Sequence, residues 1–171
     1  MVDRRGLLGA GLAGALLAGC GGSGPADRDA ALRDDRDDRA RLNDLLALEH
    51  RIVALYAGLL GAPALLGRLL EHERDHVDRL QAAVRALRGR PVRAPARVDL
   101  PGELAPLEVV RRAELTAVDA YLGTLPAIQD AGVRGLLAGI VAVEAEHLAA
   151  TDHALGGRFA PAAFVTGARR L

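Results

Sequence analysis

Residues 69–80 read LLEHERDHVDRL and place Glu73 and His76 three positions apart. Residues three or four apart lie on one face of a helix, so both polar side chains share a stripe with Leu69 and Leu80. An ionised carboxylate inside an apolar stripe is unfavourable unless a proton or a cation accompanies it. The segment therefore predicts a helix whose core-facing side carries a candidate pair of metal ligands.

The same Glu-x-x-His spacing recurs at Glu144 and His147, within the segment IVAVEAEHLAAT of residues 140–151. Its isoleucine, valine and leucine residues again form an apolar stripe that includes the glutamate and the histidine. One such motif is weak evidence for a metal site, whereas two copies in one chain are much more specific. The repeat predicts a second helix with the same kind of core-facing pair.

Two further predicted helices each carry a glutamate that is followed seven residues later by a tyrosine, at Glu49 and Tyr56 and at Glu114 and Tyr121. Both glutamates also fall within apolar stripes. Four glutamates and two histidines, with one Glu from each of two helices and one Glu-x-x-His from each of the other two, form the ligand set of a carboxylate-bridged dimetal site. For the tyrosines, core packing is the first interpretation, and a hydrogen bond to a ligand carboxylate is the second.

The spacing between motifs supports a common site. Ligands on antiparallel helices meet only when they are equally far from the turn between the helices. The midpoint of Glu49 and Glu73 is residue 61, and the midpoint of Glu114 and Glu144 is residue 129; both lie in stretches rich in glycine and proline. The glutamates of each helical hairpin are therefore expected at the same height.

The bulk properties favour one all-α domain. The chain has 171 residues, a formal net charge of zero and few aromatic residues. Alanine and leucine, which are strong helix formers, dominate, and no long stretch alternates apolar and polar residues as a strand would. The neutral charge gives no indication of nucleic acid as a partner. The sequence does not fix the number of subunits, and a homodimer is compatible with it.

The chain divides into four expected parts. They are a signal peptide (1–19), a lipidated cysteine with a flexible tether (20–26), a four-helix bundle (27–155) and a C-terminal tail (156–171). In the bundle, an Asp- and Arg-rich extension at 27–41 leads into helices expected near 42–60, 64–88, 107–125 and 132–155. The proline-containing connection at 89–106 reaches ~50 Å when extended, which spans a bundle lengthwise. This predicts a crossover that makes the second and third helices parallel.

The N-terminal segment has the features of an export signal. A basic start precedes about 14 apolar residues, which is too short for a membrane span of ~20 residues. Leu17-Ala18-Gly19-Cys20 resembles the lipobox of bacterial lipoproteins, and this resemblance implies cleavage before Cys20 and attachment of lipid to its thiol. Arg4-Arg5 resembles a twin-arginine signal. The expected location is outside the cytoplasm, with a lipid anchor in the cell membrane.

Residues 40–155 resemble the ferritin-like superfamily, in the style of the bacterioferritin and rubrerythrin di-iron sites. The resemblance implies that Glu49 and Glu114 are terminal ligands, that Glu73 and Glu144 bridge the metals, and that His76 and His147 each bind one metal. Many members carry an aspartate just before the glutamate of Glu-x-x-His. Here His72 and Val143 occupy those two positions, which puts oxygenase-type chemistry in doubt. His50, His72 and His153 are expected at the surface or rim.

Carboxylate and imidazole ligands suit two iron ions, with manganese as an alternative and zinc as a further occupant. One functional hypothesis is a di-iron oxidoreductase that reacts with oxygen or peroxide or oxidises ferrous iron; no catalytic residue is assigned. The alternatives are a non-catalytic iron-binding lipoprotein and a structural envelope lipoprotein of the same fold. In the metal-free protein, mutual repulsion and burial are expected to raise the pKa values of all four glutamates.

Overall fold

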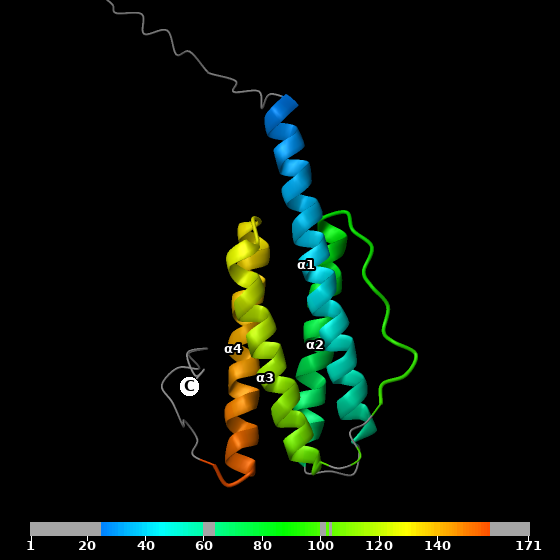
Figure 1. Ribbon diagram of the computed structural model, residues 1–171, viewed down its shortest axis with the longest axis vertical. Coiled ribbons are helices and arrows are strands. Elements are labelled where there is room, and N and C mark those ends of the chain that lie inside the picture. The colour runs from blue at the N-terminus through cyan, green and yellow to red at the C-terminus, as the bar shows by residue number, and fades with distance from the viewer. Residues whose placement is uncertain (1–24, 60–63, 100–101, 103, 158–171) are drawn as a thin grey trace, which may run out of the picture.

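The computed structural model describes residues 25–59, 64–99, 102 and 104–157, and in these residues it shows a bundle of four α-helices without strands (Figure 1). The helices are α1 (Pro25–Gly58), α2 (Ala64–Ala86), α3 (Pro106–Thr124) and α4 (Ala131–Ala154), and a short 3-10 turn, η1 (Leu125–Ala127), follows α3. The all-α prediction is confirmed. No helix in the described ranges has both the length and the apolar character that crossing a bilayer requires.

The connection between α2 and α3 is a crossover. Figure 1 shows α2 and α3 running in the same direction, with α1 and α4 antiparallel to them, while the connection follows the long side of the bundle. Its first residues are fastened to α1, because the side-chain amide of Asn43 donates to the carbonyl of Arg90 and its oxygen accepts from the backbone N–H of Val92. The predicted parallel arrangement of the second and third helices is therefore confirmed.

The end of α2 is set by a left-handed residue. Arg88 has a φ of 59°, and the N–H of Gly89 donates to the carbonyl of Val84 at 2.8 Å. This pattern is a Schellman motif, which stops a helix and satisfies its last carbonyls. A side chain at residue 89 would meet Val84 and Arg39 at 2.8–2.9 Å, so only glycine fits there. The helix consequently ends at Ala86, two residues earlier than expected.

The start of α4 is set by a cap. The carboxylate of Asp130 accepts a hydrogen bond from the N–H of Val133 at 2.8 Å, which satisfies one of the free donors of the first helical turn. The helix accordingly begins at Ala131 rather than at residue 132. Aspartate is a preferred N-cap residue, so this start could have been found from the sequence.

The beginning of α1 extends beyond the ends of the other three helices (Figure 1), and most of the Asp- and Arg-rich stretch is exposed where its side chains are described. Asp38 is an exception to the expected solvated extension, because its side chain is only 1 % exposed. Its carboxylate accepts from the backbone N–H groups of Gln129 and Asp130 at 2.8–3.1 Å. Asp38 thus ties α1 to the turn before α4, and sequence periodicity does not indicate a contact of this kind.

The turns lie where the spacing of the glutamates places them. Residue 61 falls between the end of α1 and the start of α2, although residues 60–63 lie outside the described part of the chain. Residue 129 falls between η1 and α4. The core consists of leucine, valine and isoleucine side chains contributed by all four helices, together with Tyr56 and Tyr121. The glutamates of each hairpin therefore reach the same level inside this core.

Candidate metal centre

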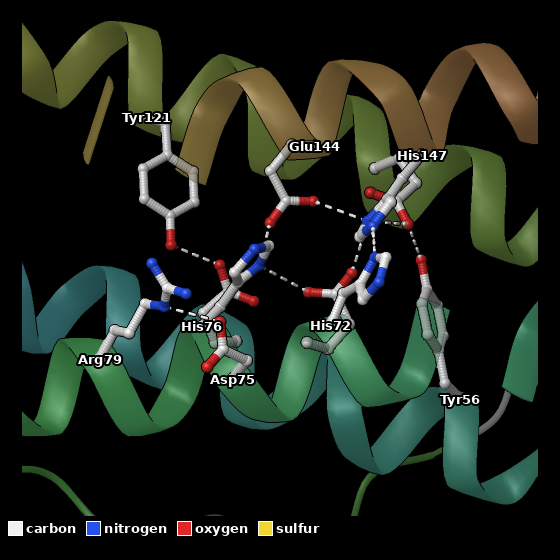
Figure 2. Close-up of polar contacts among 11 residues, drawn as sticks. Tyr56, His72, Asp75, His76, Arg79, Tyr121, Glu144 and His147 are labelled. Carbon is white, nitrogen blue, oxygen red and sulfur yellow. Dashed lines mark hydrogen bonds and ion pairs between the residues drawn. The ribbon is translucent and has the colours of Figure 1, made fainter. Parts of the chain in front are cut away.

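Six side chains from four helices converge in the middle of the core (Figure 2). The four glutamates are fully buried, and the two histidines are each only 3 % exposed. α1 and α3 contribute one glutamate each, at Glu49 and Glu114, while α2 and α4 each contribute a glutamate and a histidine. The structure thus brings together every residue that the sequence nominated as a ligand.

The six side chains form two groups that share members. One group, called position A, consists of Glu49, Glu73, His76 and Glu144. The other group, called position B, consists of Glu73, Glu114, Glu144 and His147. Within each group the potential ligand atoms lie within 4.8 Å of one another. Glu73 and Glu144 belong to both groups, so these two carboxylates lie between the two positions.

The imidazoles face carboxylates across the bundle. His76 Nδ1 lies 2.9 Å from Glu144 Oε1, and His147 Nδ1 lies 2.9 Å from Glu73 Oε1. Three further contacts from these nitrogens to carboxylate oxygens measure 3.4–3.6 Å. Two ligand atoms that bind the same ion at about 2.1 Å, with a right angle between the two bonds, lie about 3.0 Å apart. The observed separations leave the side chains of each group close enough together to share a common ion.

Each tyrosine hydroxyl reaches across the bundle to Glu49 or Glu114, the two glutamates that belong to only one group and are called the terminal glutamates. Tyr56 on α1 donates to Glu114 on α3, and Tyr121 on α3 donates to Glu49 on α1, both at 2.5 Å. Burial, followed by the charge of the adjacent glutamate, raises the pKa of both hydroxyls, so they stay protonated as donors. The second interpretation of the tyrosines, a hydrogen bond to a ligand carboxylate, is the one that the structure shows.

His72 contacts the centre in a way that the sequence did not reveal. It is exposed, as expected, but its Nδ1 lies 2.9 Å from His147 Nε2 (Figure 2). His153 is exposed as well. His50 is only 9 % exposed, and its Nε2 is buried without a hydrogen-bond partner, so its predicted surface position is wrong.

The terminal glutamates hold protons in the metal-free protein. Burial, and after it the charges of Glu144 and Glu73, raise the pKa of Glu49 well above its ordinary value. Burial is also the largest influence on Glu114, whose pKa rises to about 8. The predicted upward shift is thus right for these two carboxyl groups, which are neutral at pH 7 when no cation is bound.

The pKa values of the shared glutamates, Glu73 and Glu144, shift in the opposite direction from those of the terminal glutamates. Burial works against their ionisation, but the neighbouring imidazoles outweigh it, so that the pKa of Glu73 is lowered and that of Glu144 falls to about 2. The predicted upward shift is wrong for these two groups. The cause is that each imidazole lies close enough to a shared carboxylate to take up the proton that repulsion would otherwise place on the glutamate.

The two histidines of the centre are imidazolium ions in the metal-free protein. Burial alone would lower the pKa values of both rings, but interactions with Glu144 and Glu73 raise the pKa of His76 to about 9. Interactions with Glu114, Glu144 and Glu73 raise the pKa of His147 to about 12. Without a cation, the positive charges that compensate the shared carboxylates are therefore protons held on the rings.

The unpaired atoms of the centre fit a pair of cations. Glu49 Oε2 and Glu114 Oε2 are buried without a hydrogen-bond partner, and the buried oxygens of Glu73 and Glu144 lie within ion-pair distance of Nδ1 of the two histidines. Buried polar atoms are normally paired, and unpaired ones suggest an ion or a water molecule. Oxygen and imidazole nitrogen are ligands suited to iron, manganese and zinc. These residues consequently have the composition, the arrangement and the free ligand atoms for two metal ions.

Comparison with known proteins gives the family to which this fold belongs. The family model described as "Ferritin-like domain" matches residues 37–157, and the chain belongs to that family. Among solved structures, the chain is similar to a conserved hypothetical protein from Mycobacterium tuberculosis. The TM-score is 0.67 and the identity 21 %, over 77 % of this chain and 99 % of that chain. This likeness concerns the fold. A search of curated proteins found no match.

Proposed function

We propose that the protein binds two iron ions at positions A and B and uses them as a redox centre. The observation that carries this proposal is the pair of ligand groups that share Glu73 and Glu144 and leave buried ligand atoms unpaired. Four carboxylates balance the charge of two divalent cations, so the loaded centre is close to neutral inside an apolar core. Manganese is the alternative metal, because it accepts the same ligands.

The residues have separate tasks in this proposal. Glu49 and Glu114 would each hold one ion, with their second oxygen fixed by a tyrosine hydroxyl, while Glu73 and Glu144 would bridge. His76 and His147 would bind through Nδ1. When bound, the iron pair would supply redox chemistry, in which electrons from ferrous iron pass to dioxygen or peroxide, so that the iron is oxidised as the oxygen species is reduced. The apolar walls around the ligands keep bulk water away from the carboxylates.

Iron oxidation by the purified protein tests the redox part of the proposal. Wild-type protein should oxidise added ferrous iron in air, or consume peroxide, faster than buffer does. Glu144→Gln should lower the rate at least about tenfold, because an amide is a poor bridging ligand. Glu146→Gln is the matched control: Glu146 is exposed on the same helix, so its rate should equal that of the wild type. Stable iron binding without oxidation above the buffer rate would instead favour the non-catalytic iron-binding alternative.

We also propose that lipid on Cys20 tethers the protein to the membrane on the extracytoplasmic side. Residues 1–24 lie outside the described part of the chain, so this proposal depends on the lipobox-like sequence. In cells, Cys20→Ser should release the protein from the membrane fraction or leave it uncleaved. Unchanged mass and unchanged membrane association would contradict the tether.

A further inference from the structure

The two histidines of the centre have different surroundings on their outer sides. His147 is held at both ring nitrogens, because Nδ1 faces the carboxylates and Nε2 lies 2.9 Å from His72 Nδ1. The rings of His72 and His147 are nearly parallel, with an interplanar angle of 16° and a centroid distance of 5.2 Å. A ring fixed at both nitrogens cannot turn without breaking one of the two contacts.

Among the residues that the structure describes, none supports the outer side of the His76 ring in this way. The residue that precedes Glu144 on α4, in the place that His72 has before Glu73 on α2, is Val143, whose side chain offers no hydrogen-bonding atom. The polar contacts of the His76 ring all run from Nδ1 to the carboxylates of the centre. Its outer side can therefore move away from the centre more easily than that of His147.

A cavity adjoins this outer side of His76. Its volume is about 140 Å³, and it is lined by His72, Asp75, His76, Arg79, Gly139, Ile140 and Val143. Asp75 and Arg79 form an exposed ion pair beside it, with Oδ2 and Nε 2.6 Å apart, and both labelled side chains lie on the His76 side of the centre in Figure 2. This volume accommodates several water molecules, and hence a hydrated ion or a small ligand.

Gly139 keeps the cavity open. A methyl group at this position would meet no neighbouring atom within 4 Å, and because Gly139 lines the cavity, we expect a longer side chain there to reduce the space beside His76. Gly135 lies one helical turn earlier, is equally unobstructed, and does not line the cavity. The chain thus provides a blocking position and a matched control position on the same helix.

We infer that the two metal positions are unequal: ions and small ligands enter and leave through the cavity at position A, while His72 locks His147 and holds the ion at position B. This inference rests on the proposed function, because it requires two bound ions. His72 is a positioning residue in this account. It acts through His147 and does not bind the metal, as is usual for the outer partners of histidine ligands.

Release of zinc to a chromogenic chelator tests the inference without requiring activity. The full bundle, residues 21–171, loaded with two zinc ions should release them in two phases of equal amplitude. Gly139→Leu should slow the fast phase at least about tenfold, and Gly135→Leu should leave both phases unchanged. His72→Ala should accelerate the slow phase by about 10- to 100-fold, the range typical of lost outer partners, and His72→Asp, which still accepts a hydrogen bond, should restore it.

The outcomes separate the inference from the function on which it rests. A single release phase for two bound zinc ions, or a fast phase that Gly139→Leu leaves unchanged, would overturn the inference while two ions remain bound as proposed. Fewer than two bound ions in the wild type would contradict the dimetal centre itself. Circular dichroism of each variant, together with its zinc content before the chelator is added, shows whether the bundle is folded and loaded.

Discussion

Binding of two divalent ions at pH 7 should release about four protons from the protein. In the metal-free state one proton resides on each of four groups: the raised pKa values of Glu49, Glu114, His76 and His147 keep all of them protonated. The shared glutamates have lowered pKa values and hold no proton to release. Since metal ligands must be deprotonated, affinity is linked to pH, and the affinity for the pair should rise by up to about four decades per pH unit near neutrality.

Anaerobic titration with manganous ion in weakly buffered indicator measures this release. At pH 10 the release should be smaller than at pH 7, because His76 and Glu114, with pKa values of about 9 and 8, have already lost their protons. The double variant Glu49→Gln with Glu114→Gln removes two of the four groups, so at pH 7 it should release about two protons in total when two ions bind. Stoichiometric manganese binding with no proton release would show that the metal-free centre is not protonated as described.

The metal-free protein should lose stability as pH rises from 5 to 8. A group whose folded pKa exceeds its unfolded value stabilises the fold below the unfolded pKa, and this contribution is lost as pH rises through the folded value. For Glu49 and Glu114 the loss begins near the ordinary value of 4.5, and for His76 and His147 near 6.5. Around pH 7 the free energy of unfolding should fall by at least about 1.4 kcal/mol per pH unit, the slope for one proton.

At low pH the shared glutamates have the opposite effect on stability, because the free energy of unfolding that they contribute falls as pH falls. Because their folded pKa values are lowered, the stability that Glu73 and Glu144 contribute is present above about 4.5 and is lost as pH falls toward 2. Maximum stability of the metal-free protein is therefore expected near pH 5. Manganese should reverse the trend above pH 6, and at a hundredfold excess over the dissociation constant it should add about 2.7 kcal/mol.

Urea unfolding at several pH values, with and without manganous ion, checks this profile. The variant Glu49→Gln with Glu114→Gln should show a flatter profile between pH 5 and 6.5, since an amide does not titrate. A free energy of unfolding that rises steadily from pH 5 to 8, together with no effect of manganese, would mean that the six side chains do not form one buried cluster.

Helical periodicity and turn positions were sufficient to predict the bundle, the crossover and the convergence of the ligand residues. This works because the face of a helix follows from spacing, and because Glu49 and Glu73 are placed symmetrically about a turn. Contacts made at the ends of side chains do not follow from spacing. Asp38 reaches the turn before α4, and His72 reaches His147 on another helix, although both residues read as solvated.

The protonation states were also beyond the sequence pattern. Four carboxylates at one level suggested that all would hold protons, but the distances of 2.9 Å from Nδ1 of the histidines to Glu144 and Glu73 assign the protons differently. Only the three-dimensional arrangement shows that the terminal glutamates hold a proton in the metal-free protein and the shared glutamates do not. The end of α2 and the start of α4 differ from the expected positions for local reasons, which are the left-handed Arg88 and the cap at Asp130.

The metal content of the purified bundle tests the central claim most directly. Protein comprising residues 21–171 is reconstituted anaerobically with ferrous iron, freed of unbound metal by gel filtration, and examined by elemental analysis. The account predicts about two iron ions per chain in the wild type and in Glu146→Gln, and well below two in Glu144→Gln, which loses a ligand of both positions. An iron content near zero in the folded wild-type protein would contradict the assignment of this cluster as a dimetal centre.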